Sequence, residues 1–171
     1  PGPITGGAQY CAGLNQVYSI DAVPGAQSYF WSFPGNDWII LEGQGTTRVT
    51  VKAGTTQGKV TVATVNNCGT KSSASALTVV SVGEVPPAPT AIISDTESYC
   101  GNTTNLVYRI APVPTATSYI WTVPQGWTIT SGAGTTQITA TAGTSGGEIT
   151  VLAVNSCGQS QSVKLLTEPQ R

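Results

Sequence analysis

The sequence contains no histidine and no methionine, and only 9% of its 171 residues are charged, with a net charge of −1. Because histidine is the usual general base and triad member, its absence leaves only serines, threonines and scattered carboxylates for catalysis, and we expect no enzyme activity. A chain this poor in charge has no basic patch for phosphates, so we expect no nucleic-acid partner. No apolar run approaches the roughly 20 residues of a membrane helix, which excludes a helical membrane span.

The cysteines are few and are not spaced as Cys-x-x-Cys, which argues against a zinc site or a redox motif. They are Cys11, Cys68, Cys100 and Cys157. An even number in a chain rich in threonine, serine and glycine favours disulfides and a secreted or cell-surface location. The alternative is four buried thiols in a reducing cytosol. No signal segment opens the sequence, which we interpret as a piece of a longer protein. We expect no cofactor.

Two aromatic phrases of the same kind occur about ninety residues apart. They are "SYFWSFPGNDW" (28–38) and "SYIWTVPQGW" (118–127). Offsets of 89 or 90 residues also relate the Tyr-Cys pairs at 10–11 and 99–100, "GQGTT" to "GAGTT", and "VNNCGTKS" to "VNSCGQSQ". A fixed internal period indicates a duplicated unit. We predict two domains, 1–85 and 86–171, joined by the proline-rich linker "VPPAP" (85–89).

Each copy is predicted to consist of β-strands only, since apolar and polar residues alternate and helical periodicity is absent. The candidate strands of the first copy are "VYSIDAV" (17–23), "TRVTVKA" (47–53), "KVTVATVN" (59–66) and "SALTVVSV" (75–82), and each has a counterpart in the second copy. Turn signals containing proline, glycine and asparagine separate them. Six or seven short strands in about 85 residues predict two tandem immunoglobulin-like β-sandwiches.

Two tryptophans lie on the third candidate strand of their copies, where sandwiches of immunoglobulin type bury a tryptophan at the centre of the core. They are Trp31 and Trp121. Alternation then places Tyr29 and Tyr119 on the same inward face, with the residues between each tyrosine and tryptophan facing outward. We interpret all four aromatics as core.

The other two tryptophans, Trp38 and Trp127, follow turns that contain proline and glycine. Two interpretations remain open for them. They either pack at the edge of the core or stand exposed as platforms on which a sugar ring stacks.

The ordered motifs resemble the PKD-like (polycystic-kidney-disease-like) immunoglobulin-type repeats of secreted and surface-anchored bacterial proteins. The motifs are "AQSYFWSFPG", "GQGTTRVTV" and "VNNCGT", with "ATSYIWTVPQGW", "GAGTTQITA" and "VNSCGQS" in the second copy. The resemblance covers nearly the whole chain. It implies tandem sandwich modules of adhesins or exported hydrolases, often exported by the type IX route, with no catalytic residues. The family's Gly-Asp-Gly turn is replaced here by "PGND" and "PQGW", which argues against a cation site at that turn.

Equivalence of the repeats suggests disulfides Cys11 to Cys68 and Cys100 to Cys157, each worth roughly 4 kcal/mol on the chain-entropy model. The usual Greek-key order raises an objection, because it places the two cysteines of a copy at opposite ends, roughly 20 Å apart. Bridging requires α-carbons within about 7 Å. One bent strand over residues 38–52 would remove the conflict. Free thiols or links between the copies would contradict the pairing.

Three carboxylates bracket the linker and are weak candidates for a calcium site that would stiffen it. They are Glu84, Asp95 and Glu97. Calcium takes six to eight oxygen ligands, so the simpler interpretation is solvated surface charge, and we expect no metal.

Two classes of function compete. We favour a non-catalytic spacer or adhesion module that holds or presents a neighbouring domain of the parent protein, with flanking domains, and a polysaccharide or cell-surface ligand, as its partners. The alternative is a carbohydrate-binding module that uses Trp38 and Trp127. A third possibility is that a partner adds a strand to an open sheet edge.

Overall fold

A computed structural model describes residues 1–96 and 98–170. The described residues form fifteen β-strands and no helix, so none of them belongs to a helix that could span a membrane. The chain divides into two compact units, Pro1–Glu84 and Val85–Arg171, called here the first and second unit. The prediction of an all-β fold with two immunoglobulin-like sandwiches is confirmed.

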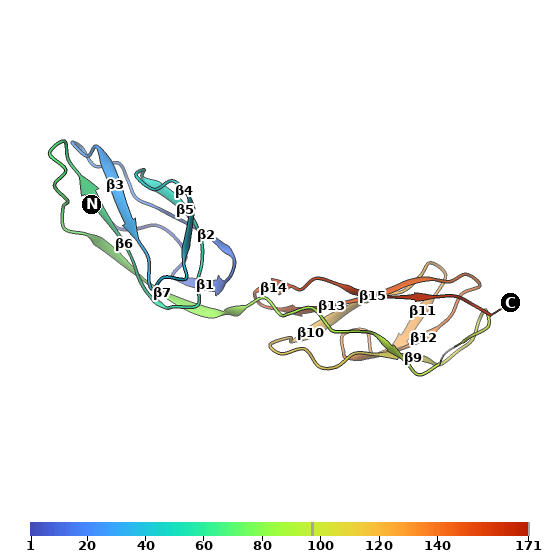
Figure 1. Ribbon diagram of the computed structural model, residues 1–171. Coiled ribbons are helices and arrows are strands. Elements are labelled where there is room, and N and C mark those ends of the chain that lie inside the picture. Colours follow the sequence, from blue (N-terminus) through green and yellow to red (C-terminus); the bar gives the residue numbers. More distant parts are fainter. Residues whose placement is uncertain (97, 171) are drawn as a thin grey trace. The chain divides into compact units, whose positions relative to one another are not determined.

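The first unit packs two sheets face to face (Figure 1). Its strands are β1 (Gln9–Ala12), β2 (Asn15–Ser19), β3 (Ser28–Ser32), β4 (Ile39–Glu42), β5 (Arg48–Lys52), β6 (Gly58–Val65) and β7 (Ser75–Glu84). One sheet has the order β1-β7-β6-β3 and the other has the order β2-β5-β4. All pairs are antiparallel except β1 with β7, which run parallel.

The second unit repeats the two-sheet arrangement. Its strands are β8 (Ile93–Ser94), β9 (Leu106–Arg109), β10 (Ser118–Thr122), β11 (Thr128–Ser131), β12 (Gln137–Thr141), β13 (Gly147–Asn155), β14 (Gly158–Gln159) and β15 (Val163–Thr167). One sheet contains β10, β13, β14 and β15, and the other has the order β11-β12-β9-β8. Both units therefore derive their layers from the same strand pattern.

Each unit has its own core, formed by the inward positions of alternating strands. In β5 and β6 of the first unit these positions are Val49, Val51, Val60 and Val62, all fully buried. In β12 and β13 of the second unit they are Ile138, Ala140, Ile149 and Val151, also fully buried.

The repeated "GQGTT" and "GAGTT" phrases form the turn that separates two antiparallel strands. Gly43 and Gly132 have φ angles of +84° and +81°, and a Cβ atom there would lie 2.1 and 2.0 Å from the carbonyl oxygens of Arg48 and Gln137. Only glycine fits such a turn. The alternative of one bent strand over residues 38–52 is therefore wrong, because β4 and β5 are separate strands that pair with each other.

Candidate functional site

The repeated tryptophans of the third strand fill the two cores. Trp31 is 1% exposed, and its indole N–H donates to the Thr46 carbonyl over 2.8 Å. Trp121 is 7% exposed and donates to the Thr135 carbonyl over the same distance. A buried indole needs such a hydrogen-bond acceptor, and both are supplied by the glycine turn that follows. Both tryptophans are part of the scaffold.

The tyrosines two residues earlier support the same cores from the side. Tyr29 and Tyr119 are half-buried and pack against the clusters of buried side chains. Each hydroxyl accepts a backbone N–H over 2.9 Å, from Val23 and Val113 respectively. The intervening residues, Phe30 and Ile120, are exposed, as the alternation predicts.

The second pair of tryptophans lies at the edge of the core in both units. Trp38 and Trp127 are only 8% and 7% exposed. Their indole N–H groups donate over 2.9 Å to the carbonyls of Thr56 and Ser145. Neither indole presents a free face on which a sugar ring could stack, so the structure does not supply the predicted glycan platform.

Aromatic neighbours enclose these indoles. Tyr10 meets Trp38 edge-on with ring centroids 4.8 Å apart, and Phe33 stacks on it at 5.5 Å. In the second unit Tyr99 meets Trp127 edge-on at 5.0 Å. Such geometries favour packing of the ring quadrupoles. The phrases that suggested a binding site are therefore used for packing.

Asp37 fastens the loop before Trp38 to the loop between β5 and β6. One carboxylate oxygen accepts the N–H and hydroxyl of Thr55 and the N–H of Thr56. These hydrogen bonds, the Thr55 hydroxyl first among them, hold the pKa of the Asp37 carboxyl at about 2, below its ordinary value of 3.8. Sequence reasoning missed this role, because the aspartate has no acidic counterpart in the second copy.

The cysteines do not form the predicted pairs within each unit. Cys68 and Cys100 are free and exposed thiols. Cys11 and Cys157 are disulfide-bonded. The predicted pairs Cys11 to Cys68 and Cys100 to Cys157 are therefore wrong in this structure.

Strand length explains the correction. In the first unit Cys11 lies opposite Gly83, whereas Cys68 lies in the turn that precedes Ser75. Eight residues of extended strand separate these two positions on β7, about 26 Å at 3.3 Å per residue. The objection from the Greek-key order therefore stands, since β4 and β5 remain two strands.

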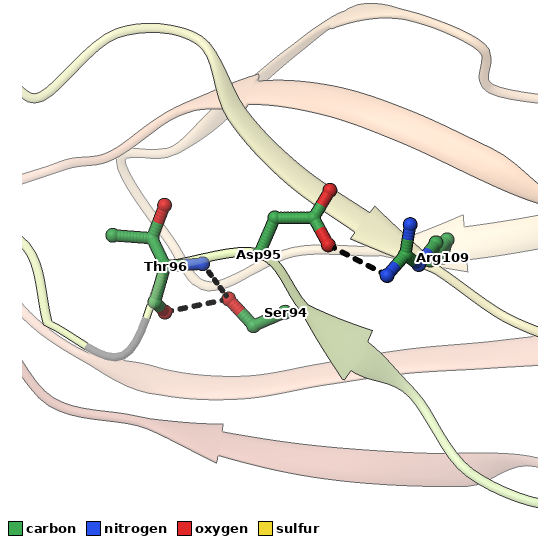
Figure 2. A network of polar contacts seen from close by, with 4 residues as sticks. All are labelled: Ser94, Asp95, Thr96 and Arg109. Atoms are coloured by element: carbon green, nitrogen blue, oxygen red, sulfur yellow. Dashed lines mark hydrogen bonds and ion pairs between the residues drawn. The ribbon is translucent and has the colours of Figure 1, made fainter.

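The structure places one of the three carboxylates near the linker in an ion pair within the second unit. Asp95 pairs with Arg109 over 2.9 Å, while the neighbouring Ser94 hydroxyl bonds to the backbone of Thr96 (Figure 2). Glu97 lies outside the described residues, and Glu84 belongs to the other unit. In the described part of the chain, no three acidic or cysteine side chains are grouped to hold a metal.

The pairing of the terminal strands of the first unit was not predicted. Gln9 to Ala12 run parallel to Val80 to Glu84 with a bulge between Tyr10 and Cys11. The Val80 N–H also donates to the Ala8 carbonyl over 2.9 Å. The four-residue segment "QYCA" is too short to show the period of a strand. This parallel pair, called here the terminal strand pair, joins the beginning and the end of the unit.

An apolar edge strand distinguishes the surface of the first unit. Strand β4 lies at the edge of its sheet, and Ile39 and Leu41 are 56% and 50% exposed. In the second unit the corresponding strand β11 reads Thr-Ile-Thr-Ser. An open edge with apolar side chains is a typical place for another strand to pair.

The chain belongs to the family of PKD-like domains, which matches it twice, over residues 1–79 and 85–167. The prediction of tandem PKD-like repeats is thereby confirmed. None of the curated proteins compared with the chain matches it.

Solved structures resemble the fold with low sequence identity. The N-terminal eight Ig domains of the Down Syndrome Cell Adhesion Molecule align with 94% of this chain at 14% identity, with a TM-score of 0.52. The adhesin FdeC of Escherichia coli aligns with 96% of the chain at 20% identity and a TM-score of 0.37. This chain covers 26% and 63% of those two structures. The first likeness supports the immunoglobulin-like fold alone.

Proposed function

We propose that the chain is a non-catalytic spacer or adhesion module of a secreted or cell-surface protein and that it resists mechanical force. The observation that supports this function best is the terminal strand pair, because its parallel direction decides how the first unit responds to tension. The oxidised state of Cys11 and Cys157 supports an extracellular place, since disulfides persist in oxidising compartments.

The chain enters and leaves the first unit at opposite ends of β7. The Ser75 hydroxyl, at the start of β7, donates to the Pro1 carbonyl over 2.7 Å, whereas β7 ends at Glu84. A pull on the two chain ends therefore draws β1 and β7 past each other in opposite directions. The hydrogen bonds between the two parallel strands lie at a large angle to the direction of the applied force. Several of them must therefore break together before the unit can unfold.

The second unit is fastened differently at the same place. The Gln170 N–H donates to the Tyr99 carbonyl over 2.8 Å, and the described residues form no parallel strand pair there. Forced unfolding depends on the barrier to unfolding, which is set by the contacts that must break first. The two units of this chain should therefore differ in mechanical resistance.

Of the two units, the first has the surface that is better suited to the adhesive role in this proposal. Its exposed strand β4 has the open edge and the apolar side chains that suit pairing with an extended segment of a partner protein. Nothing in the geometry favours glycan binding, because Trp38 and Trp127 are enclosed.

Single-molecule stretching of the whole chain tests the proposed resistance to mechanical force. The chain is held at its two ends under reducing conditions, so that no disulfide carries the load. We expect two unfolding events, the stronger from the first unit. Val80→Pro removes the N–H that bonds to Ala8 and should lower the stronger force, whereas Val80→Ala keeps that N–H and serves as the matched control.

The result that would overturn the proposal is equal forces for the two units of the unaltered chain, or a stronger event that belongs to the second unit. Hydrogen exchange at the core amides of β6 shows whether the Val80→Pro variant is folded before it is stretched. If the variant leaves the first unit unfolded, the single event that remains belongs to the second unit, and its force assigns the two events of the unaltered chain.

A further inference from the structure

The two units differ in the side chains of the strand at one sheet edge. In each unit this strand pairs on one side only, β4 with β5 and β11 with β12. Equivalent positions read Ile-Ile-Leu-Glu in β4 and Thr-Ile-Thr-Ser in β11. Both strands have an irregular register at the same place, between Ile40 and Glu42 and between Ile129 and Ser131. The backbone of the edge is therefore alike in the two units, and its side chains are not.

The edge of the first unit is apolar where that of the second is polar. In β11 the Thr130 hydroxyl donates to the Thr139 carbonyl over 3.0 Å. The equivalent of Thr130 in the first unit is Leu41, which is 50% exposed, and the preceding Ile39 and Ile40 are 56% and 37% exposed. Natural sheets usually avoid an open apolar edge, because it attracts a further strand. Burial of these three side chains against another strand would be favourable.

The backbone of Ile40 directs its hydrogen-bonding groups to the open edge. Ala53, just after β5, exchanges two backbone hydrogen bonds with residues 13–14, just before β2, over 2.8 and 2.9 Å. Alternation along the strand then directs the N–H and carbonyl of Val51 to β2 as well. Ile40 lies opposite Val51 on the other side of β5. Its N–H and carbonyl therefore point away from β5, and no backbone hydrogen bond between described residues outside the β4–β5 pair uses them.

Charges of opposite sign flank the apolar segment on the outer face of the sheet. Thr50 and Lys52 face outward, because they alternate with the buried Val51. Glu42, at one end of β4, accepts the Thr50 hydroxyl over 3.0 Å and lies on the same face. Lys52 lies opposite Ile39, at the other end of β4, and forms no salt bridge with a described residue. The edge is thus negative at one end and positive at the other.

We propose that the partner of this edge is a second copy of the chain, whose β4 pairs antiparallel with β4 about a twofold axis at Ile40. The inference rests on the adhesive role proposed above and names its partner. Twofold dimers, in which the same surface of both copies forms the interface, are the commonest protein oligomers. The pairing joins the three-stranded sheets of the two copies into one continuous sheet, since β4 lies outermost, beyond β5 (Figure 1).

The apolar and backbone groups of the edge complement each other in this arrangement. The Ile40 N–H of each copy donates to the Ile40 carbonyl of the other, so both outward-pointing groups are paired. Ile39 of one copy lies opposite Leu41 of the second copy, and the twofold axis repeats this contact. The exposed apolar side chains of both edges are thereby removed from water together.

The charges match as well. Glu42 of the second copy lies opposite Trp38, one residue from Ile39, which in turn lies opposite Lys52. Two strand spacings then separate the α-carbons of Glu42 and Lys52, about 10 Å, a distance that the two long side chains can span. The axis repeats this ion pair, so the dimer contains it twice.

Analytical ultracentrifugation of the whole chain tests the pairing. The free thiols of Cys68 and Cys100 are first blocked with iodoacetamide, so that no disulfide links two copies. We expect a monomer–dimer equilibrium between about 1 μM and about 1 mM. The Ile39→Thr/Leu41→Thr variant gives β4 the threonines of β11 and should stay monomeric over this range. Hydrogen exchange at the core amides of β6 shows that the variant is folded.

Charge reversal tests the direction of pairing. Glu42→Lys and Lys52→Glu each place like charges at both ion-pair sites, and we expect each to weaken the dimer about tenfold. An equal mixture of these two variants should regain the affinity of the unaltered chain, because opposite charges then meet at both sites. Lys59→Glu, on an exposed position of β6 in the other sheet, changes the net charge as Lys52→Glu does and should leave the dimer intact.

A chain that stays monomeric up to about 1 mM would overturn the inference. So would a dimer that persists in the threonine variant, or a mixture of the two charge variants that binds no more tightly than each alone. Failure here is distinct from failure of the proposed function, because single molecules are stretched without a partner. A monomeric chain with a strong first unit loses this inference alone, and a dimer with equal unfolding forces loses the mechanical role alone.

Discussion

The loops that hold Trp38 and Trp127 bury the two indoles in the same way, but different contacts fasten the two loops. In both units the indole N–H bonds to a carbonyl over 2.9 Å at the edge of the core. The first unit secures this loop with the Asp37 carboxylate, whereas the equivalent position in the second unit is Gly126, with a φ of +85°. A charged side chain fastens one loop, and close backbone packing fastens the other.

The strand near the beginning of each unit shows a second difference. In the second unit β8 is tied to β9 by the ion pair between Asp95 and Arg109. The equivalent positions of the first unit are Gly6 and Ser19, where an isolated bridge joins Thr5 to Ser19 instead. The repeats thus share the buried aromatics and differ in the polar contacts that fasten their loops and edges. The shared buried aromatics form the scaffold. The polar contacts that differ can be altered by substitution in one unit at a time.

Glycine to alanine substitutions should distinguish the two ways of fastening the loop. Of the changes considered, they should have the largest effect on the stability of a unit. A Cβ at Gly143 would lie 2.9 Å from the Gly126 carbonyl oxygen, which is backbone and cannot move aside. We expect Gly143→Ala to destabilise the second unit by about 1 to 3 kcal/mol. Hydrogen exchange with mass spectrometry on the intact chain, followed at core amides of β13, measures the loss.

The matched control is Gly54→Ala in the first unit. A Cβ there would lie 2.4 Å from the carboxyl carbon of Asp37, a side chain that can be removed. We therefore expect Gly54→Ala to add little further loss in an Asp37→Ala background. An equally large loss in both backgrounds would contradict the division between side-chain and backbone fastening.

Acid should lower the stability of the first unit by protonating Asp37, and this effect should be smaller than that of the glycine substitutions. Hydrogen bonds from Thr55 and Thr56 lower the pKa of the folded carboxyl to about 2 from an ordinary 3.8. A depressed pKa means that the stabilisation is fully present above about pH 4 and is lost as the pH falls towards 2. Unfolding of the first unit, followed by hydrogen exchange between pH 5 and 2, should show this loss.

Asp37→Asn is the control for the acid effect, because it removes the titrating group and leaves the side chain close in size. The first unit of this variant should be less stable at pH 5 and should lose less stability on acidification than the unaltered unit. If the pH dependence of the first unit is unchanged in the variant, Asp37 is not its source.

The sequence was sufficient to predict what repetition and alternation determine. The period of 89 or 90 residues identified the two copies, and the position of Trp31 and Trp121 on the third strand identified the core. These features depend on many residues that agree with one another. Burial of Trp38 and Trp127 remained open, because a turn with proline and glycine precedes both packed and exposed tryptophans.

Contacts between residues far apart in the sequence were harder to predict. The disulfide pairing depends on which end of β7 each cysteine lies near, and equivalence of the repeats carries no information about ends. The terminal strand pair joins residues about seventy positions apart, and its short first strand has no period of its own. Asp37 was read as part of a turn, since its partners, Thr55 and Thr56, lie in another loop.

Removal of the ion pair of the second unit should have the smallest effect. The side chains of Asp95 and Arg109 are 42% and 49% exposed, so water and salt screen their attraction. We expect Asp95→Asn to cost the second unit less than about 1 kcal/mol and the difference to shrink in high salt.

Glu148→Gln, which breaks the exposed pair with Lys164, is the matched control and should cost about as little. Unfolding of the second unit is measured for both variants with calcium and with a chelator. A loss of stability in Asp95→Asn alone, seen only when calcium is present, would contradict the assignment of Asp95 to the ion pair with Arg109. Equal and small losses in both solutions would leave the difference between the repeats as one of ordinary polar contacts.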